Sequence, residues 1–517
     1  MWSTVRVLRR PILRQQGLRR LSNAPQVEGT TKDNAEIDTE EAIKPFDAIP
    51  GRPQGLREFI RMFIKLKQGA LRKPWEIVEE DRALFGPIYK SGFGVYKVVS
   101  VFDPKDIETL LRHEGKHPYR PDLVPWLAYR EYRGYPKGVL LLHGPEWLRN
   151  RSALNQRMLR PKVISGHAGT INEVVDDMIR RLKLKSSQGS DLVVNDLESD
   201  LFKYALDGAG SVLFDQRLRL LDDKLHPDAE TFINSVHTVF KEFVSLVIVP
   251  PKLQKMLNTK SWRKHTEAWD FIFSHAKKLV EAKMEKVTKT LEKEDFEEGE
   301  ADFITYLVSQ GKISTEEIYA NITEMLSAAI DTTSNALKWS LYEVARQPEV
   351  QERFYEEIKS VLSGREVPTA DDIAKMPYLK GVVKETLRLY PACLSFTRIL
   401  DHDIVIRGYR IPAKQPISCQ TFIICRDPKI FEDPLKFKPE RWLRTGKSDI
   451  NVFASLPFGF GPRMCLGRRL AELELHLLLI RIIQTFRLES LNDVEPVFTT
   501  LVTPNEPLRL KFTQREL

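Results

Sequence analysis

The chain has 517 residues, of which 42% are hydrophobic and 29% are charged, a balance that excludes a wholly disordered protein and allows a large folded core. Its net charge of +8 suggests nucleic-acid binding, but six arginines precede the first acidic residue and leave the remainder nearly neutral. The four cysteines lie in the last quarter of the chain without paired or zinc-like spacing, so we expect no disulfide framework.

The N-terminal segment has the composition of a targeting sequence. Residues 1–22 are rich in arginine, contain no acidic residue and include interspersed apolar residues, which predicts a mitochondrial transit peptide; a disordered basic tail is the alternative. Arginines interrupt every apolar run, so we expect no membrane-spanning helix, which needs about 20 apolar residues. Residues 23–44 are polar and acidic and predict a disordered linker, with the folded part beginning near Pro45.

The next segments predict helices and a small sheet. Residues 56–71 mix apolar and basic residues, as expected of an amphipathic helix that either packs on the core or contacts a membrane surface. Alternating apolar residues over 89–101 predict a β-hairpin. Trp147 and Arg151 lie four apart on a helix that Pro145 can start, so both project from one face. Residues 240–249 are apolar but too short to span a bilayer, which suits either a membrane-dipping lip or a buried helix end.

A long helix follows, with an unusual pair of residues in its middle. Ser314 and Glu317 form a capping-box pattern that predicts the helix start. Asp331 and Thr332 then lie within an apolar stripe, although an acid and an alcohol compete for backbone hydrogen bonds in mid-helix. Their occurrence there indicates a functional role.

The most informative stretch is the glycine-rich sequence Phe458-Gly459-Phe460-Gly461-Pro462-Arg463-Met464-Cys465-Leu466-Gly467. Its glycines allow backbone amides to approach the sulfur of Cys465 at the start of a periodic apolar helix, and amides together with the helix dipole stabilise a thiolate. The sequence therefore predicts a haem-iron thiolate ligand. An ordinary buried free thiol is the alternative.

On these residues the chain resembles the cytochrome P-450 family, whose Phe-x-x-Gly-x-Arg-x-Cys-x-Gly signature it matches at every fixed position. The resemblance extends from Pro45 to the C-terminus. It implies a mainly α protein over residues 45–517, a single large unit with a long central helix over the haem and small β-sheets.

The resemblance also implies roles for individual residues. Haem b would be bound through Cys465 on the iron and through Arg120, Trp147, Arg151, Arg398, Phe458 and Arg463. Asp331 and Thr332 would relay protons during dioxygen activation. The substrate pocket would include Leu123, Trp126, Leu140, Phe240, Phe243, Ala328, Cys393, Ser395, Phe396, Thr397 and Leu501, with residues 123–140 forming a loop over the haem. Glu385, Arg388 and Arg441 would form a buried charge cluster that supports the haem loop.

Basic residues favour the mitochondrial branch of the family. Lys380, Lys384, Arg468 and Arg469 match positions on which that branch docks an acidic ferredoxin, itself reduced by an NADPH-dependent reductase. Residues 125–133, 257–260 and 265–270 are most similar to vitamin D 24-hydroxylating members, and residues 511–515 to sterol 27-hydroxylating members.

The resemblance therefore implies a monomeric monooxygenase, peripheral on the matrix side of the inner mitochondrial membrane, that uses dioxygen to hydroxylate a sterol or secosteroid side chain. Another lipid or xenobiotic substrate is an alternative. Two alternatives belong to other functional classes. A haem-thiolate isomerase would need neither an electron partner nor the acid–alcohol pair, and a haem or sterol carrier would need no proton relay, so Asp331, Thr332 and the basic residues argue against both.

Overall fold

The structure is a computed structural model without ligands. It describes residues 43–53, 55–93, 96–188, 190–222, 227–291, 301–443 and 450–516. The predicted transit peptide and all but the end of the predicted linker lie outside the described residues.

Helices dominate the described chain. Those of its first half are α1 (Leu56–Lys67), α2 (Trp75–Phe85), α3 (Pro104–Arg112), α4 (Val124–Arg133), α5 (Gly144–Met158), α6 (Pro161–Gly166), α7 (Ala168–Gln188), α8 (Leu197–Phe214) and α9 (Pro227–Ile248). Those of its second half are α10 (Pro251–Met256), α11 (Lys260–Leu291), α12 (Phe303–Gln310), α13 (Thr315–Arg346), α14 (Pro348–Leu362), α15 (Ala370–Ala374), α16 (Pro377–Leu389), α17 (Thr421–Ile424) and α18 (Arg468–Thr485). Short 3-10 turns are η1 (Phe46–Ala48), η2 (Ser190–Leu192), η3 (Pro439–Trp442) and η4 (Val452–Ala454).

The strands form four small sheets. They are β1 (Ile88–Phe93), β2 (Tyr96–Val101), β3 (Phe396–Ile399), β4 (Ile404–Ile406), β5 (Tyr409–Ile411), β6 (Pro416–Cys419), β7 (Phe486–Ser490), β8 (Pro496–Phe498), β9 (Val502–Pro504) and β10 (Leu510–Gln514). The largest sheet has the order β1-β2-β6-β3, in which only β2 and β6 are parallel, with Val99 opposite Ile417. Antiparallel pairs β4-β5, β7-β10 and β8-β9 form the others.

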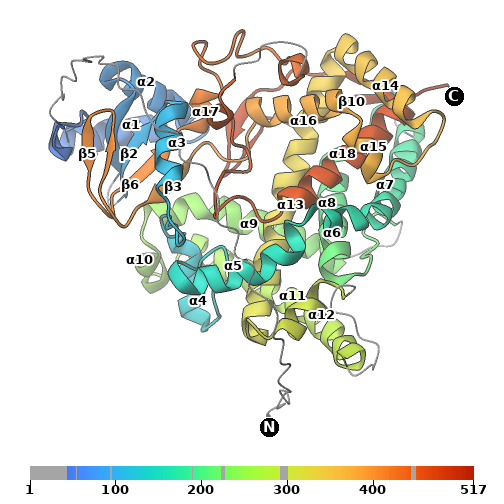
Figure 1. The fold of residues 1–517 in the computed structure, drawn as a ribbon, viewed down its shortest axis with the longest axis horizontal. Helices are drawn as coiled ribbons and strands as arrows, with labels where there is room; N and C mark the ends of the chain where they lie inside the picture. The colour runs from blue at the N-terminus through green and yellow to red at the C-terminus, as the bar shows by residue number, and fades with distance from the viewer. Residues whose placement is uncertain are drawn as a thin grey trace, which may run out of the picture. The chain divides into compact units, whose positions relative to one another are not determined.

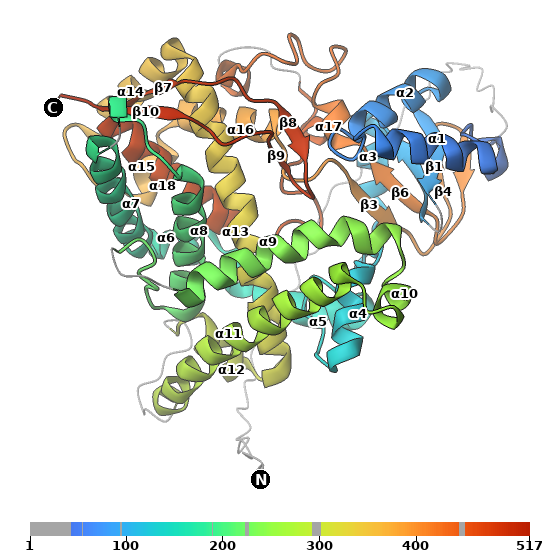
Figure 2. The same ribbon diagram turned by 180° about the vertical axis from the view of Figure 1, so that it is seen from behind.

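Helix α13 runs through the middle of the molecule in both views (Figures 1 and 2). Ser314 and Glu317 form the predicted capping box at its start. It packs against α8, α11, α16 and α18, and most of its residues are buried on every face, as expected of a helix at the centre of a large core. The remaining helices surround it, and the β1-β2-β6-β3 sheet lies to one side with α1, α2 and α3 (Figure 1).

The mainly α fold with small sheets was predicted correctly, and so were the helices at 56–67 and 144–158 and the 88–101 hairpin. Residues 123–140 differ from the expected loop, because Val124–Arg133 is helical. Pro125 lies in the first turn of α4, where its missing amide is tolerated, and Gly134 ends the helix in the left-handed conformation.

The apolar segment at 240–249 completes α9 and does not end in the core. Ile248 and Val249 are 39% and 40% exposed, and Met256 and Leu257 in and after α10 are still more exposed. Among the described residues, no helix has the length and apolar character needed to cross a bilayer.

Candidate functional site

The loop before α18 presents the sulfur of Cys465 at the helix N-terminus. Gly459 and Gly461 have positive φ angles of 71° and 74°, a conformation that glycine adopts without strain. A Cβ on Gly461 would lie 2.7 Å from a carboxylate oxygen of Glu114, so any other residue here would also displace that carboxylate. The amide of Cys465 donates to the carbonyl of Phe458 at 2.7 Å and closes the loop.

Cys465 is accessible to solvent but surrounded by protein. Burial raises the pKa of its thiol, while the amide of Gly467 and the charge of Arg151 act in the opposite direction. Burial likewise raises the pKa of Cys393, with a further contribution from nearby Cys465. Both cysteines have exposed surface although protein surrounds their thiols closely enough to shift the pKa, so they line an internal space and not the outside of the molecule. Ala328 is also exposed, although Ser327 and Ile330 beside it in α13 are buried.

Four arginines gather near this internal space. Burial, followed by the charges of Arg120, Arg398 and Arg151, lowers the pKa of Arg463 to about 8. The acid among them, Glu114, accepts a hydrogen bond from Arg398. Buried guanidinium nitrogens of Arg120 and Arg151 have no hydrogen-bond partner among the described residues. Unpaired buried cations are costly, so the cluster is suited to bind anionic groups such as carboxylates.

The acid–alcohol pair of α13 is held by two different partners. The hydroxyl of Thr332 donates to the carbonyl of Ala328, one turn earlier, at 2.8 Å. The carboxylate of Asp331, which is 7% exposed, lies 2.9 Å from Nε2 of His237 on α9. The sequence did not identify His237 as a site residue, because the contact joins residues far apart in the chain.

Aromatic rings from three helices meet beside α13. Trp126 of α4 contacts Phe240 and Phe243 of α9 with centroid distances of 5.6 and 5.9 Å, and Trp269 of α11 at 5.3 Å. All three contacts are edge-to-face, a favourable arrangement for aromatic pairs. The structure thus brings together three of the predicted pocket residues and packs Trp126 against Trp269, which is buried in the core.

Other predicted pocket residues lie on neighbouring segments. The hydroxyl of Thr500 donates to the carbonyl of Phe240 at 2.8 Å, which ties the β8-β9 turn, where Leu501 lies, to α9. Phe396 and Thr397 lie on β3, directly after Ser395. Leu123 and Leu140 are partly buried against the helical core.

A buried carboxylate fixes the segment after α4. Glu324 of α13 accepts hydrogen bonds from the amides of Gly138 at 3.0 Å and Leu140 at 2.8 Å. Its second neighbour is Arg130 of α4, 3.8 Å away and equally buried, whose guanidinium group lies over the rings of Trp269 and Phe273. The sequence analysis missed Glu324, although an acid among the apolar residues of a central helix is itself an indication of a buried partner.

Comparison with known proteins decides the family. Residues 53–512 match the family model described as Cytochrome P450. The chain belongs to the cytochrome P450 family. It is 35% identical over 477 residues to the mitochondrial cholesterol side-chain cleavage enzyme of Oncorhynchus mykiss, which covers 92% of this chain and 91% of the relative. It is 37% identical over 452 residues to the mitochondrial 1,25-dihydroxyvitamin D(3) 24-hydroxylase of Mus musculus, a match that covers 87% of this chain and 85% of the relative. It is 33% identical over 530 residues to Cytochrome P450 27C1 of Danio rerio, a match that covers 98% of this chain and 96% of the relative.

As a cytochrome P450, the protein is a haem-thiolate monooxygenase whose cofactor is a haem iron with a cysteine ligand. The residues present fit this group. Cys465 offers a thiol facing an internal space, and the unpaired nitrogens of Arg120 and Arg151 offer partners for two carboxylates. Arg151 additionally donates to the carbonyl of Met464 at 2.7 Å, so it joins α5 to the cysteine loop.

Arg463 and Trp147 pack on each other in this P450. The guanidinium carbon of Arg463 lies 4.2 Å from the centroid of the Trp147 ring. Arg463 donates to the backbone carbonyls of Pro118 at 3.0 Å and Leu142 at 2.7 Å. These partners of Arg463 all lie in the chain itself, whereas Arg120 and Arg151 of the same cluster keep buried donors without a partner among the described residues.

Glu385, Arg388 and Arg441, which the sequence predicts to form a buried charge cluster, contact one another in the structure. Glu385 and Arg388 of α16 are fully buried and hydrogen-bonded at 2.7 and 2.8 Å, and Arg441 of η3 donates to Glu385 at 2.9 Å. Trp442 also donates to Glu385 at 2.9 Å, an interaction that the sequence did not indicate. Arg388 donates to backbone carbonyls of residues 425 and 434, so the cluster ties α16 to the segment leading to the cysteine loop.

The predicted docking residues lie on two adjacent helices. Lys380 and Lys384 are on α16, which packs against α18, and Arg468 and Arg469 begin α18. Lys384 is exposed, whereas Nζ of Lys380 donates to the carbonyl of residue 374 at 2.9 Å. Arg468 and Arg469 both lie within 4 Å of Glu472, which offsets part of their charge.

Proposed function

We propose that this P450 is a mitochondrial monooxygenase that hydroxylates the side chain of a sterol or secosteroid with electrons from a ferredoxin. The observation that carries the proposal is the accessible thiol of Cys465, which protein surrounds and which lies near buried arginine nitrogens without a partner among the described residues. Residues 45–517 form the catalytic unit, preceded by a transit peptide at 1–22 and a linker at 23–44.

The cofactor and the chain have separate tasks. Haem iron with a thiolate ligand supplies dioxygen activation and insertion of one oxygen atom into a C–H bond. Cys465 holds the iron, and Arg120 and Arg151 bind the haem carboxylates with Arg398 beside them. Asp331 and Thr332 hold protons at the carboxylate and the hydroxyl and pass them toward the internal space. Burial of Asp331 in the core limits the access of bulk water to its carboxylate.

An apolar substrate with a rigid ring system suits the pocket. Phe240 and Phe243 of α9 are partly exposed beside the buried ring of Trp126, and such aromatic surface binds large apolar ligands through buried area and shape. The names of the relatives, a cholesterol side-chain cleavage enzyme and a vitamin D 24-hydroxylase, point to the same substrate class.

Electron supply and location follow from the surface and the relatives. Lys380, Lys384, Arg468 and Arg469 provide a basic face on α16 and α18 for an acidic ferredoxin. The exposed apolar residues at the end of α9 and in α10 support peripheral contact with the inner mitochondrial membrane from the matrix side. The named relatives include mitochondrial enzymes.

The first prediction tests the iron ligand. Cys465→Ala should abolish the absorbance band that a thiolate ligand gives to the reduced, carbon-monoxide-bound haem, because alanine offers no donor to iron. Cys393→Ala, which removes the other accessible cysteine, is the matched control and should keep the band. A thiolate-type band in the Cys465 variant would refute the assignment. Titration of the wild type with sterols and secosteroids, followed by the haem absorbance shift, then tests the substrate class.

A further inference from the structure

His237 of α9 lies beside the acid of the proposed relay, where α9 packs across the central helix α13 (Figure 2). Its Nε2 is 2.9 Å from a carboxylate oxygen of Asp331, and neither atom has a hydrogen-bond partner among the described residues. The side chain of His237 is 35% exposed, whereas its Nε2 is buried. The imidazole ring therefore extends from accessible space to a buried carboxylate.

The face of α13 that meets α8 and α9 is polar over two turns. Asp331, Asn335 and Lys338 follow one another at i, i+4 and i+7, which places them on one side of the helix, and all three are buried. Lys338 forms an ion pair with Glu198 at the start of α8, whose side chain is 45% exposed. A line of polar groups thus leads from the surface at Glu198 toward Asp331.

Phe202 of α8 connects His237 to this line. The centroid of its ring lies 4.3 Å from that of His237 and 5.3 Å from Nζ of Lys338. Oδ1 of Asn335, like Oδ1 of Asp331, is buried without a hydrogen-bond partner among the described residues. Ordered water usually satisfies such atoms in folded proteins, and water between polar groups can carry protons. The junction of α8, α9 and α13 therefore suits proton transfer.

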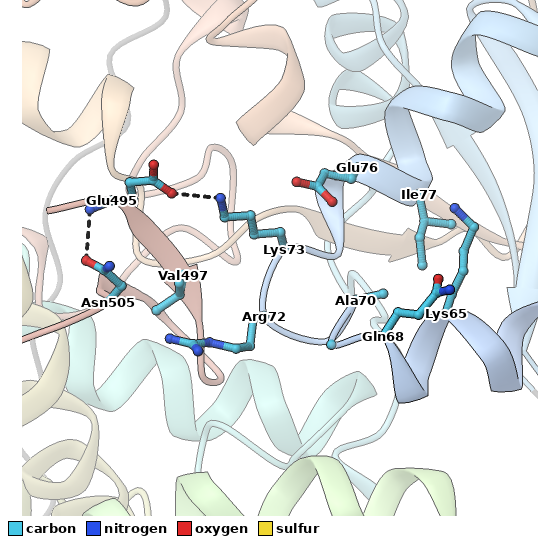
Figure 3. A pocket seen from close by; sticks show the side chains of 11 residues that line it. Lys65, Gln68, Ala70, Arg72, Lys73, Glu76, Ile77, Glu495, Val497 and Asn505 are labelled. Atoms are coloured by element: carbon cyan, nitrogen blue, oxygen red, sulfur yellow. Dashed lines mark hydrogen bonds and ion pairs between the residues drawn. The ribbon is translucent and has the colours of Figure 1, made fainter.

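A surface groove elsewhere on the molecule does not include these residues. It has a volume of about 530 Å³ and lies between the α1–α2 turn and the β8-β9 hairpin (Figure 3). Lys65 and Glu495 are among the residues that line it, whereas His237, Asn335 and Lys338 are not. Solvent in this groove therefore contacts none of the groups that lead to Asp331.

An imidazole beside a carboxylate is suited to move protons, because one ring nitrogen can release a proton while the other accepts one. We propose that His237 is a positioning residue that supplies protons to Asp331 from the junction of α8, α9 and α13. In each transfer the proton on Nε2 passes to the carboxylate of Asp331, the other ring nitrogen takes a proton from water, and no electron moves. This inference rests on the proposed roles of Asp331 and Thr332 and adds the group that reprotonates them.

The chemistry of the family requires such a supply. Insertion of one oxygen atom of dioxygen into a C–H bond consumes two electrons and two protons, and the second oxygen atom leaves as water. The electrons come from the ferredoxin, and the protons come from solvent. A buried acid that gives up a proton has to regain one before the next turnover.

The test uses the full-length, haem-loaded protein with ferredoxin, its reductase and NADPH. His237→Gln keeps a polar side chain of similar size that cannot carry a proton. His275→Gln is the matched control, because His275 of α11 also lies beside a carboxylate, that of Asp228, and contacts the ring of Phe232 on α9. Asp331→Asn is the reference for loss of the relay. The rate of NADPH consumption is measured in H2O and in D2O with cholesterol as the probe sterol.

Two further measurements do not depend on turnover. The C–O stretching frequency of the carbon-monoxide-bound protein responds to charges and hydrogen-bond donors near the ligand. The thermal midpoint establishes that each variant is folded. His237→Phe, which keeps a ring beside Phe202, is a second substitution at the same position and should behave as His237→Gln does.

We expect His237→Gln and Asp331→Asn each to slow NADPH consumption about tenfold and to about double the ratio of the rates in H2O and D2O, because proton transfer then limits turnover. The C–O stretching frequency should shift in both, and His275→Gln should match the wild type. Wild-type behaviour of both His237 variants beside an altered Asp331→Asn would overturn this inference alone. Wild-type behaviour of Asp331→Asn would overturn the proposed relay as well. Equal effects of His237→Gln and His275→Gln would also overturn the inference, because the loss would then reflect packing.

Discussion

At the residue scale, the acid and the alcohol of α13 are adjacent in sequence but are positioned independently. Thr332 is fixed by its own helix, through the carbonyl of Ala328, whereas Asp331 lies beside His237 of α9. Helix α9 also carries Phe240 and Phe243, so one helix contacts both the acid and the aromatic pocket. The two members of the proposed relay are thus separable by mutation.

Thr332→Ala should uncouple electron consumption from hydroxylation, because the hydroxyl that holds a proton beside the internal space is lost. We expect product formed per NADPH to fall by about tenfold or more, with peroxide formed in place of product. Thr332→Ser keeps the hydroxyl and should restore most of the coupling. The measurement is the ratio of hydroxylated product to NADPH consumed in a ferredoxin-reconstituted assay. Full coupling in the alanine variant would place the relay elsewhere.

Glu474 of α18 is a buried acid outside the proposed mechanism. Burial raises its pKa well above that of a free glutamate, and a hydrogen bond with Thr333 acts in the opposite direction. A Cβ on Gly208 of α8 would lie 2.2 Å from its carboxyl group, so the helices are closely packed there. The folded protein therefore retains a proton that the unfolded chain releases above about pH 4.3.

Stability from this proton is complete below the unfolded pKa and is lost as pH rises toward the folded pKa. Glu474→Gln removes the titration while keeping the shape. We expect its thermal midpoint to fall less than that of the wild type between about pH 5 and pH 8. Glu472→Gln, on the exposed side of the same helix, should behave as the wild type does. A midpoint slope unchanged by Glu474→Gln would show that the group is ionised in the folded state.

At the element scale, α16 and η3 are joined by one buried carboxylate. Glu385 accepts from Arg388, Arg441 and Trp442, and Arg388 reaches backbone carbonyls of the segment before η3. The haem loop follows η3 in the chain and packs near α5 through Arg151. Loss of the carboxylate would leave two buried cations without a counterion.

Glu385→Gln should therefore destabilise the protein by about 3–5 kcal/mol and reduce haem retention, because buried pairs are costly to break on one side. Glu352→Gln removes the acid of a surface pair with Arg515 and should cost below about 1 kcal/mol. Thermal unfolding and the haem-to-protein absorbance ratio provide the two readouts. Equal effects from the two substitutions would mean that the cluster does not support the loop.

At the scale of the whole molecule, charge is distributed unevenly over a nearly neutral body. The proposed docking face on α16 and α18 and helix α10, whose exposed apolar residues are proposed to contact the membrane, lie in different parts of the molecule (Figure 1). Electron delivery and membrane attachment can therefore occur together. Local clustering, and not the net charge of +8, sets these interactions.

Lys380→Glu with Lys384→Glu should weaken ferredoxin binding and leave substrate affinity nearly unchanged, because both lysines lie away from the aromatic pocket. The effect should appear mainly in the association rate and diminish as salt rises above about 0.1 M, where the Debye length is about 10 Å. Lys277→Glu with Lys278→Glu, exposed on α11, is the control of equal charge. Turnover against ferredoxin concentration and a spectral substrate titration separate the two outcomes, and an unchanged ferredoxin dependence would exclude this face.

The sequence by itself determined the fold class, the main helices and the loop bearing Cys465. These depend on local rules: the capping box of α13, the proline that starts α5, and glycines 459 and 461, which adopt positive φ. The cysteine motif and the order of the other motifs also determined the P450 family, which the comparison with known proteins confirmed.

Only the tertiary structure decided the contacts between distant segments. His237 beside Asp331, Glu324 beneath residues 138–140, and Trp442 on Glu385 each join elements that no local pattern pairs. The same holds for the open face of α1, because the composition of this helix fits burial and membrane contact equally well. Packing determines which side chains lose water and which remain exposed, and packing is a property of the folded chain as a whole.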